Sequence, residues 1–492
     1  MLGDQLRRDG GALRGLRPGK VRILMVESDA KVATGRWHRQ RLHFVLASMR
    51  RFAEELRAEG FSVDYRHAPS LRAGLRAHRA EFAPDRVTAM SPMSFDGRAM
   101  LRELEVEIVA NDQFLCGAEE FAAWAGTRKS LKMEDFYRWQ RTRLDVLMDG
   151  DEPVGGKWNF DSENREPPPK DGRSWPSPMV DPLDGIDARV IADIARRAPH
   201  SFGAAPEGLW ATTRAGALAR LQQFIDEVLP LFGPHEDAVL SSEWKMAHSA
   251  LSPYLNIGLL HPSEVVDAAH SAFREGRVPI ASAEGFIRQV IGWREYVWGL
   301  YWLWMPEYRT ANALQATAPL PAAFMGGPTE MACVAHTVSG IDDRAWVHHI
   351  ERLMILGNLS LTSGVRPSAA VEWMWKSFID GAEWVMLPNL IGMALYADGG
   401  RMATKPYASG GAYINRMSDH CGGCRFDPTK RIGEHACPFT TLYWDFLSRN
   451  ESALRSNHRL GNQLGSMKKL KDLDSVKERA VEIRSRLIDG TV

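Results

Sequence analysis

The sequence predicts an α/β domain at the N-terminus, built on a doubly wound parallel sheet, followed by a larger all-α domain. Two observations support this division. Up to about residue 112, apolar strand-like runs alternate with amphipathic helical runs, as in βαβ units. After a proline-rich stretch at residues 166–187, long helix-compatible runs follow with little strand signal. We place the α/β domain at residues 1–125, a linker at 126–205 and the helical domain at 206–492.

Apolar runs in the N-terminal part predict four strands, at residues 21–26, 61–67, 86–90 and 106–110. Helices are expected between them, at residues 41–59, 71–82 and 98–105. The first of these helices ends at Gly60 and carries apolar residues at helical spacing: Leu42, Val45, Leu46, Met49, Phe52 and Leu56. This alternation predicts a parallel sheet with helices on both faces.

The middle of the chain contains six prolines within residues 166–187, so it can form neither a helix nor an inner strand. We expect an extended linker that runs over the surface. Beyond it, helices are predicted at residues 213–229, 284–304, 345–358 and 368–378.

Charge and hydropathy exclude some functional classes. The 492 residues include 61 Lys and Arg against 61 Asp and Glu, so no global field attracts nucleic acid. Residues 401–471 are locally basic, with 12 Lys and Arg against 5 Asp and Glu, which suits either a solvated face or a phosphate-contacting surface. No run is long enough for a membrane span and no signal peptide is recognisable, so we expect a cytoplasmic protein without membrane contact.

Three of the five cysteines fall within 17 residues. Cys421 and Cys424 form a C-x2-C pair, Cys437 follows, and Cys333 lies 88 positions upstream of Cys421, while Cys116 is remote. Two thiolates on one tight turn suit a single metal centre, and four sulfur ligands satisfy either tetrahedral zinc or a [4Fe-4S] cluster. Redox-active thiols are a third interpretation. Disulfides fit poorly because the cysteine count is odd and the chain lacks secretory character.

Polar residues recur at helical spacing in the second half of the chain. Residues 248–258 place Ser249 and Ser252 at the start of a helix, which suits a phosphate or, more simply, a helix cap. Gln289 and Trp293 are four apart with Arg294 beside them, and His349 and Arg352 are three apart. Glu383 is a candidate partner for Arg352, with Asn389 close by. Taken singly, each motif is equally compatible with an ordinary core helix.

Together these segments resemble the photolyase/cryptochrome superfamily, and specifically its iron–sulfur bacterial branch, the prokaryotic (6-4) photolyases. The resemblance covers nearly the whole chain. It includes G-D-Q-L (residues 3–6), R-K-S-L-K-M-E-D-F-Y (128–137), P-V-G-G-K-W-N-F-D-S-E-N-R (153–165), Y-I-N-R-M-S-D-H-C-G-G-C (413–424) and Y-W-D-F-L (443–447). It implies a photolyase architecture, a flavin in the helical domain, and light-driven repair of (6-4) photoproducts in UV-damaged DNA by a monomer.

The resemblance also implies roles for individual residues. FAD is expected against His248, Ser249, Ala250, Leu251, Ser252, Gln289, Trp293, Arg294, Arg352, Glu383 and Asn389. The lesion pocket and its proton transfer are expected to involve His349, His348, Tyr407 and Tyr413, with DNA contacts from Asp161, Arg165, Lys405 and Arg416. The four clustered cysteines, Cys333, Cys421, Cys424 and Cys437, are expected to hold a [4Fe-4S] cluster, and Trp373 to carry electrons.

The sequence departs from the family pattern in three places. The chain begins Met1-Leu-Gly-Asp, so the family's first strand is expected to be truncated or absent. Lys31 and Thr34 differ from the acidic and aromatic residues associated with the antenna 6,7-dimethyl-8-ribityllumazine, which argues against antenna binding. Met374 and Met325 stand where aromatic residues of the electron route are expected, so the route would pass through Trp375 or Trp384 instead.

Two functions from other classes remain compatible with the sequence. A cryptochrome-like flavin photoreceptor would share most of these motifs and repair nothing. A zinc-stapled nucleic-acid-binding protein would share the cysteines alone and would be colourless, whereas flavin and an iron–sulfur cluster both absorb visible light.

Overall fold

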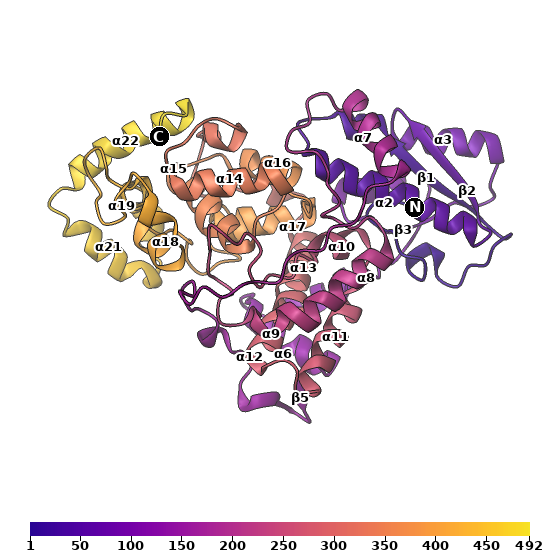
Figure 1. Cartoon of the computed structure of the whole chain (residues 1–492), viewed down its shortest axis with the longest axis horizontal. Coiled ribbons are helices and arrows are strands. Elements are labelled where there is room, and N and C mark those ends of the chain that lie inside the picture. Colours follow the sequence, from indigo (N-terminus) through magenta and orange to yellow (C-terminus); the bar gives the residue numbers. More distant parts are fainter.

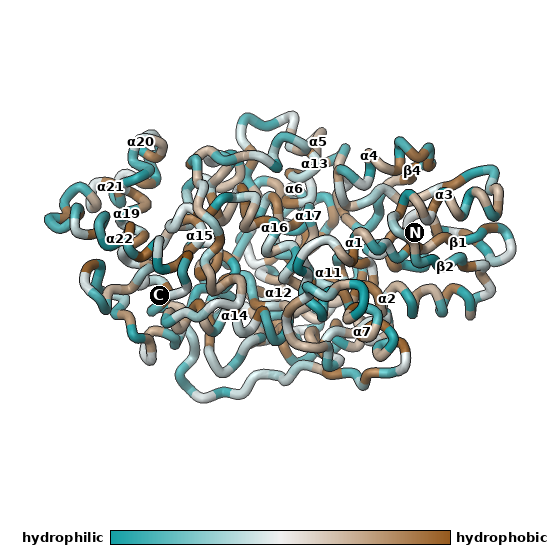
Figure 2. Tube along the Cα trace, turned by 90° about the horizontal axis from the view of Figure 1, so that it is seen from above, coloured by the Kyte–Doolittle hydropathy of each residue, from teal (hydrophilic) through white to brown (hydrophobic).

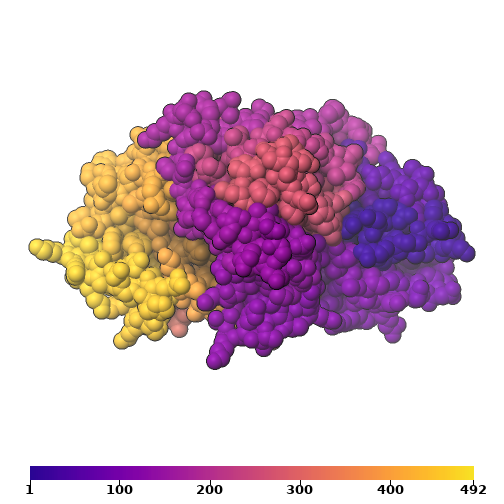
Figure 3. Space-filling model, turned by 90° about the horizontal axis from the view of Figure 1, so that it is seen from below, coloured from indigo at the N-terminus to yellow at the C-terminus, as the bar shows by residue number.

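A computed structural model describes all residues, 1–492. The N-terminal strands and helices lie at one end of the molecule and helices α18–α22 at the other (Figure 1). Helices α6 and α8–α13 form a third lobe between these ends. The space-filling view likewise shows the N-terminal and C-terminal residues at opposite ends, with the middle of the chain between them (Figure 3). No helix combines the length and apolar character that crossing a membrane requires.

The N-terminal strands form two separate parallel ladders. β1 (Arg22–Ser28) pairs with β2 (Ser62–Ala68), and β3 (Thr88–Met90) pairs with β4 (Glu107–Val109). The single doubly wound sheet that the sequence predicted is therefore not formed. The N-terminal residues connect the two ladders by individual hydrogen bonds: the Met1 amine donates to the Leu24 carbonyl (2.8 Å), and the Gln5 side chain donates to the Ser91 carbonyl (3.1 Å). A full strand at that place would be needed to make one continuous sheet.

The three helices predicted in this part are α2 (Arg39–Ala58), α3 (Leu71–Phe82) and α4 (Phe95–Glu103), and they agree with the prediction to within three residues at each end. Two further helices, α1 (Asp29–Ala33) and α5 (Ala118–Gly126), were not predicted. The apolar face of α2 is buried, and the Ser70 hydroxyl caps α3 by accepting a hydrogen bond from the Ala73 amide.

The segment predicted as a linker combines two helices with an extended run. It contains α6 (Met133–Leu144), the hairpin β5 (Met148–Asp149) and β6 (Glu152–Pro153), residues 166–184 without regular structure, and α7 (Gly185–Arg197). Asp184 and Asp187 form a capping box at the start of α7, and both carboxylates pair with Arg51 on α2 (2.7 Å each). The chain thus returns from the linker to the N-terminal part, where α7 lies beside α2 (Figure 1). The domain boundaries remain a prediction.

The rest of the chain is helical. Its α-helices are α8 (Arg214–Gln223), α9 (Leu229–Phe232), α10 (Ser252–Ile257), α11 (Pro262–Arg274), α12 (Ile280–Ile287), α13 (Glu295–Trp304), α14 (Ala332–Arg344), α15 (Asn358–Ser363), α16 (Pro367–Ser377), α17 (Glu383–Leu387), α18 (Gly411–Met417), α19 (Pro438–Arg449), α20 (Glu451–Leu454), α21 (Gly461–Lys468) and α22 (Leu473–Asp489). Short 3-10 helices are η1 (Gly11–Leu13), η2 (Val154–Gly156), η3 (Asp161–Glu163), η6 (Glu307–Thr310), η7 (Ala322–Met325), η10 (His420–Gly423) and η11 (His458–Leu460).

Four π-helical segments interrupt or extend these helices: η4 (Phe224–Val228), η5 (Arg288–Arg294), η8 (Glu351–Gly357) and η9 (Pro388–Ala394). The predicted helix at residues 284–304 is therefore α12, η5 and α13 in succession. π-Helical turns are rare and occur frequently at functional sites. Three of these four segments carry residues expected near the flavin, so the widened turns coincide with the predicted site.

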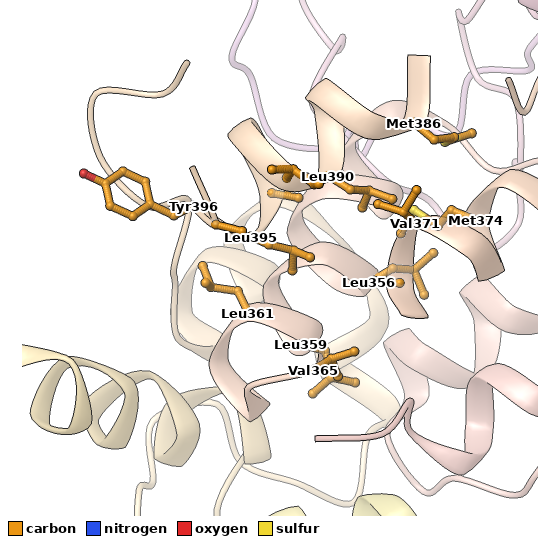
Figure 4. Close-up of a cluster of buried hydrophobic side chains, with 14 of the residues drawn as sticks. Leu356, Leu359, Leu361, Val365, Val371, Met374, Met386, Leu390, Leu395 and Tyr396 are labelled. Carbon is orange, nitrogen blue, oxygen red and sulfur yellow. The ribbon is translucent and has the colours of Figure 1, made fainter. Parts of the chain in front are cut away.

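A large apolar core supports these π-helical segments. Figure 4 shows Leu356 of η8, residues of α15 and α16, and Leu390 of η9 gathered into one cluster, with the Tyr396 ring at its edge. Along the chain trace, hydrophilic and hydrophobic residues are mixed in outer helices such as α7 (Figure 2). The site helices are thus fixed by packing rather than by exposed loops.

Candidate active site and cysteine pocket

Four cysteines line one small cavity, which we call the cysteine pocket. Cys333 lies on α14, Cys421 in η10, Cys424 just after it, and Cys437 at the start of α19. The rest of the wall is mostly apolar, with Met331, Ile414, Phe426 and Phe439, and it also includes His420. All five cysteines are free thiols, and Cys116 lies outside this pocket, with its backbone amide donating to Glu295 (2.9 Å). The pairing of distant Cys333 with the C-x2-C turn agrees with the prediction.

The cysteine pocket favours the neutral, protonated form of its thiols. Burial and the neighbouring thiols of Cys437, Cys421 and Cys424 raise the pKa of Cys333, and the pKa of Cys421 is raised to about 12 for the same two reasons. Thiols that suppress one another's ionisation become ligands when a metal ion neutralises their charge. Four such sulfurs in one cavity satisfy the requirement of a tetrahedral metal site.

Three histidines form the histidine site, together with Asp237. His348 is buried and stacks on His248, with 4.3 Å between ring centroids and an angle of 15°. His349 instead is 48% exposed and its Nε2 contacts Asp237 (3.3 Å). The two neighbouring histidines therefore point in different directions, as expected for consecutive positions at the start of a helix. They share the site but have different environments.

The three histidine rings differ in pKa. Burial and the neighbouring His349 lower the pKa of His248 to about 3, and burial lowers that of His348 well below its ordinary value. Burial also opposes protonation of His349, but the hydrogen bond and the charge of Asp237 outweigh it and raise the His349 pKa. His349 is thus the one ring of the three that favours its cationic form.

The ring nitrogens of the three histidines lie within 4.8 Å of one another. Their arrangement is nevertheless unsuited to a metal ion, because lone pairs lie in the ring planes and the stacked planes of His248 and His348 cannot meet at one point. Both nitrogens of His248 also face backbone carbonyls, those of Lys245 (3.0 Å) and Glu236 (3.1 Å).

The residues predicted for the lesion pocket come together around His349. Tyr407 and Tyr413 pack against a small apolar cluster that includes Ile350. Burial raises the pKa of Tyr407, and Asp161, Arg165 and Asp237 all lie close enough to influence it electrostatically. Burial likewise raises the pKa of Tyr413.

The charged residues predicted to contact DNA are largely exposed. Arg165 pairs with Asp161, which also contacts the buried Arg288 (3.3 Å). Arg416 is exposed and its guanidinium lies 5.6 Å from the Tyr413 ring centroid, while Lys405 is exposed. A basic rim thus adjoins the tyrosines of the pocket.

Arg352 pairs with Asp380, not with Glu383. Its guanidinium contacts both carboxylate oxygens of Asp380 (2.9 and 3.1 Å). Glu383 contacts Arg309 (2.6 Å) and accepts a hydrogen bond from Tyr301 (2.9 Å). The predicted Arg352–Glu383 pair was therefore wrong. The cause is the break between α16 and α17, which places Asp380 beside Arg352 and turns the start of α17 toward α13.

The remaining residues predicted to hold FAD lie at the start of α10, on η5 and on η9, and Ser252 contacts the same pair. Ser252, at the start of α10, donates to Asp380 (2.6 Å); Ser249 accepts from the Leu251 amide (3.4 Å), with Ala250 at a positive φ of 52° between them. On η5, Gln289 donates to Glu236 (2.7 Å) and Trp293 is partly buried. Asn389 on η9 donates to the Val385 carbonyl (2.8 Å).

Two buried donors near these residues have no partner. They are Nε of Arg294 and Nε1 of Trp384, and the Arg294 guanidinium lies 5.4 Å from the Trp384 ring centroid. The other guanidinium nitrogens of Arg294 are bound, to Glu295 (2.8 Å) and to the Gln113 carbonyl (3.2 Å). Buried donors are nearly always satisfied in folded proteins, so this pair marks space for a polar ligand.

The tryptophan predicted to carry electrons is isolated from other indoles. Trp373 is buried, donates to the Phe324 carbonyl (2.8 Å), and stacks on the Phe324 ring at 4.6 Å. In contrast, Trp384 lies 5.7 Å from Trp298, which lies 5.4 Å from the partly buried Trp302. These three indoles form a continuous series from the core outward.

Sequence reasoning missed Asp380, Asp237 and Glu236. The signal for Asp380 was an acidic residue next to glycine at a helix break, and the signal for the other two was a short acidic pair between helices. Both patterns are common in loops that have no function, so neither stood out.

Comparison with solved structures gives the same architecture. The fold resembles that of a bacterial class III photolyase from Agrobacterium tumefaciens (TM-score 0.57, 16% identity, 99% of this chain and 96% of that one). It also resembles a cryptochrome from Synechocystis sp. PCC6803 (TM-score 0.56, 14% identity, 98% and 97%). The chain therefore has the photolyase/cryptochrome fold.

Sequence comparison is more specific. Residues 1–210 match the model of the family described as deoxyribodipyrimidine photo-lyase-related protein. The chain is 42% identical over 472 residues, 94% of its length and 93% of the relative's, to a protein of Agrobacterium fabrum named (6-4) photolyase. The chain belongs to this photolyase-related family. Membership implies a flavin cofactor, FAD, and the two unpartnered donors, Nε of Arg294 and Nε1 of Trp384, fit such a ligand.

Proposed function

We propose that this protein uses blue light to repair (6-4) photoproducts in DNA. The observation that carries the proposal is the grouping of His349, Asp237, Tyr407 and Tyr413 beside the Arg352–Asp380 pair, in a chain 42% identical to a protein named (6-4) photolyase. A lesion base is poorly stacked and is therefore the least costly base to turn out of the duplex into such a pocket.

His349 is the proton donor in this proposal. Repair must return an oxygen to its original base, which requires a proton to be supplied and taken back at hydrogen-bonding distance. Asp237 raises the His349 pKa and so favours the cationic imidazole, while the partial exposure of the ring leaves it accessible to an incoming base. Tyr407 and Tyr413 form an amphipathic wall, and Asp161 and Arg165 lie at its edge.

Arg352, Asp380, Arg294 and the residues of η5 and η9 would hold the flavin. When bound and reduced, FAD supplies one electron to the lesion on excitation by blue light. Arg352 supplies a charge-assisted hydrogen bond, and Asp380 fixes the direction of the guanidinium. The buried helices around the site exclude water from it.

The cysteine pocket is proposed to hold a [4Fe-4S] cluster through Cys333, Cys421, Cys424 and Cys437. The four-sulfur geometry suits both zinc and iron, and the family resemblance favours iron. Bound there, the cluster would join α14 to η10 and α19. Five free cysteines are consistent with a reducing, cytoplasmic location, and we propose a monomer.

Two further elements complete the proposal. The Trp384, Trp298 and Trp302 series is the proposed route by which electrons reach the flavin from the surface, since Trp373 stacks on a phenylalanine that is far harder to oxidise. No lumazine antenna is proposed, because Lys31 and Thr34 depart from the binding pattern and both are exposed.

The deciding experiment uses two duplexes, one with a defined (6-4) lesion and one with a cyclobutane dimer. The reduced holoprotein should restore the first under blue light and do nothing in the dark. Chromatography of digested DNA measures the restored bases. A flavin-loaded, iron-containing protein that repairs neither lesion would support the photoreceptor function instead, and a colourless zinc protein would support the nucleic-acid-binding alternative.

A further inference from the structure

A carboxyl group, that of Glu351, is buried directly beneath the histidine site. Glu351 opens η8 and is 2% exposed. Its Oε2 accepts a hydrogen bond from the His348 backbone amide (3.2 Å), and Oε1 accepts one from the Thr337 hydroxyl (3.4 Å). No Lys or Arg nitrogen lies within 4.0 Å of it, and the basic groups nearest to it are two imidazoles: His348 Nε2 at 3.5 Å from Oε2 and His336 Nε2 at 3.9 Å from Oε1.

Both members of the Glu351–His348 pair are incompletely satisfied. Neither ring nitrogen of His348 has a hydrogen-bond partner, although the ring is 2% exposed and held between His248 and the carboxyl. A buried carboxylate without a cation and a buried imidazole without a partner are each unfavourable. A shift of a few tenths of an ångström in their 3.5 Å separation would give the unpartnered His348 ring a hydrogen bond to the carboxyl group.

The ionisation of Glu351 is poised near neutrality. Burial raises its pKa to about 7, opposed by the hydrogen bond from the His348 amide. The charged and titratable groups that face the pair from the surrounding elements are His248, His336, Arg344, His349 and Arg352. A neutral carboxyl can donate to an imidazole nitrogen, whereas an ionised one can only accept.

We propose that Glu351 positions the proton of His348. In its protonated form the carboxyl donates to Nε2 of His348, which leaves the proton of the neutral ring on Nδ1. One ring nitrogen of His348 lies within 4.8 Å of one ring nitrogen of His349, a span that one water molecule bridges. With Nδ1 protonated, His348 cannot accept the proton that His349 delivers to the lesion.

Ionised Glu351 has the opposite effect. It accepts from Nε2–H, so Nδ1 of His348 becomes a free acceptor and competes for the His349 proton. Repair should therefore decline as pH rises through the Glu351 titration, in addition to the decline caused by deprotonation of His349 itself. This inference rests on the proposed function only for its effect on repair; the placement of the proton stands on its own.

The direct test is nitrogen NMR of the dark holoprotein with ¹⁵N-labelled histidine, with the His348 signals identified by their loss in His348→Asn. In the parental protein Nε2 should change from hydrogen-bond acceptor to N–H donor as pH rises across the Glu351 titration. In Glu351→Gln, whose amide donates at every pH, Nε2 should stay an acceptor. A His348 tautomer that does not change with pH in the parental protein would overturn the inference, and this measurement needs no variant of Glu351.

The second readout is the pH profile of repair. The parental profile should contain two inflections, and Glu351→Gln should lose the one due to Glu351 while retaining that of His349 and a full complement of FAD. Glu372→Gln, on the exposed face of α16, is the matched control and should keep both. An unchanged profile in Glu351→Gln would contradict the proposed role. If the parental protein repairs nothing, the proposed function fails, while the NMR result still decides the inference.

Discussion

The histidine site and the cysteine pocket are both assembled from distant segments of the helical part, yet their polar groups are satisfied in opposite ways. In and beside the histidine site most charged groups pair with other protein groups: His349 with Asp237 and Arg352 with Asp380, while the His348 ring has no hydrogen-bond partner. In the cysteine pocket, buried thiols face other thiols and suppress one another's ionisation. The histidine site should keep its shape without a ligand, and we expect the proposed metal to stabilise the cysteine pocket.

Helix α14 connects the two sites. It carries Cys333 near its start, and Thr337 one turn later shares its single hydroxyl proton between the Cys333 carbonyl (2.8 Å) and Glu351 (3.4 Å). Damage to the cysteine pocket should therefore reach the histidine site, while damage to the histidine site should leave the cysteine pocket intact. This asymmetry is what the following experiments test.

The largest effect is expected from Cys421→Ser. Structural metal ligation by thiolates contributes about 10–16 kcal/mol in small zinc domains, comparable to the whole stability of a typical domain at about 5–15 kcal/mol. We expect loss of bound metal and of most soluble protein. Soluble yield, with iron and inorganic sulfide per chain, measures both.

Cys116→Ala is the control for this experiment, because Cys116 lies outside the pocket and should be tolerated with full metal content. A soluble Cys421→Ser protein with unchanged iron would contradict the expectation that the cysteine pocket needs Cys421 to bind its metal. Zinc without sulfide in the parental protein would show that the cysteine pocket binds zinc in place of an iron–sulfur cluster.

His349→Ala should have the next largest effect, and it should change only the rate of repair. General acid–base assistance is typically worth about a hundred- to ten-thousandfold, so repair should fall by that factor. FAD, metal content and thermal stability should be unchanged, since the ring is half exposed. His348→Ala should reduce repair less. His200→Ala, at an exposed position, is the control, and repair at the parental rate in His349→Ala would exclude the proton-donor role.

Much of the difference between the histidine site and the cysteine pocket could be predicted from the sequence. The cysteine pocket follows from the C-x2-C turn and the scarcity of cysteines, since few alternative ligand sets exist. The helices at residues 41–59 and 71–82 follow from apolar spacing and caps, which are local properties. The residues around Tyr407 and Tyr413 came from resemblance to a family, and periodicity alone would not have grouped them.

What the sequence did not predict depends on long-range geometry. The π-helical turns change the spacing of Gln289 and Asn389 without any residue that signals it. The pairing of Arg352 with Asp380 depends on how the chain turns after α16, and the splitting of the sheet depends on how residues near Met1 connect β1 to β3. In each case tertiary packing overrides a local pattern.

Asp380→Asn should weaken FAD binding, because it removes the charge that orients Arg352. A charge-assisted hydrogen bond at a buried site is worth about 1.5–3 kcal/mol, or about ten- to a hundredfold in affinity. Arg352→Ala should lose at least as much. Flavin content after dialysis and the dissociation constant from fluorescence measure the loss.

Glu383→Gln is the matched control, since Glu383 pairs with Arg309 in the structure. It should retain FAD at the parental affinity. If Glu383→Gln loses flavin while Asp380→Asn keeps it, the result would favour the Arg352–Glu383 pair predicted from the sequence. In both variants the cysteine pocket should keep its metal.

The smallest effect is expected from Arg416→Ala, at the exposed rim beside Tyr413. One phosphate contact fewer should reduce the slope of log affinity against log salt concentration by about 0.9 and weaken DNA binding equally for damaged and undamaged duplexes. Lys405→Ala should behave alike, whereas Arg86→Ala, exposed on the N-terminal part, should not. Fluorescence anisotropy over a salt series measures these slopes.

Because the rim residues are exposed and contribute neither to the Arg352–Asp380 pair nor to the cysteine pocket, flavin and metal content should stay at parental levels. A rim variant that lost either would mean that the surface and the two buried sites are coupled, which the separate pairing of their groups argues against.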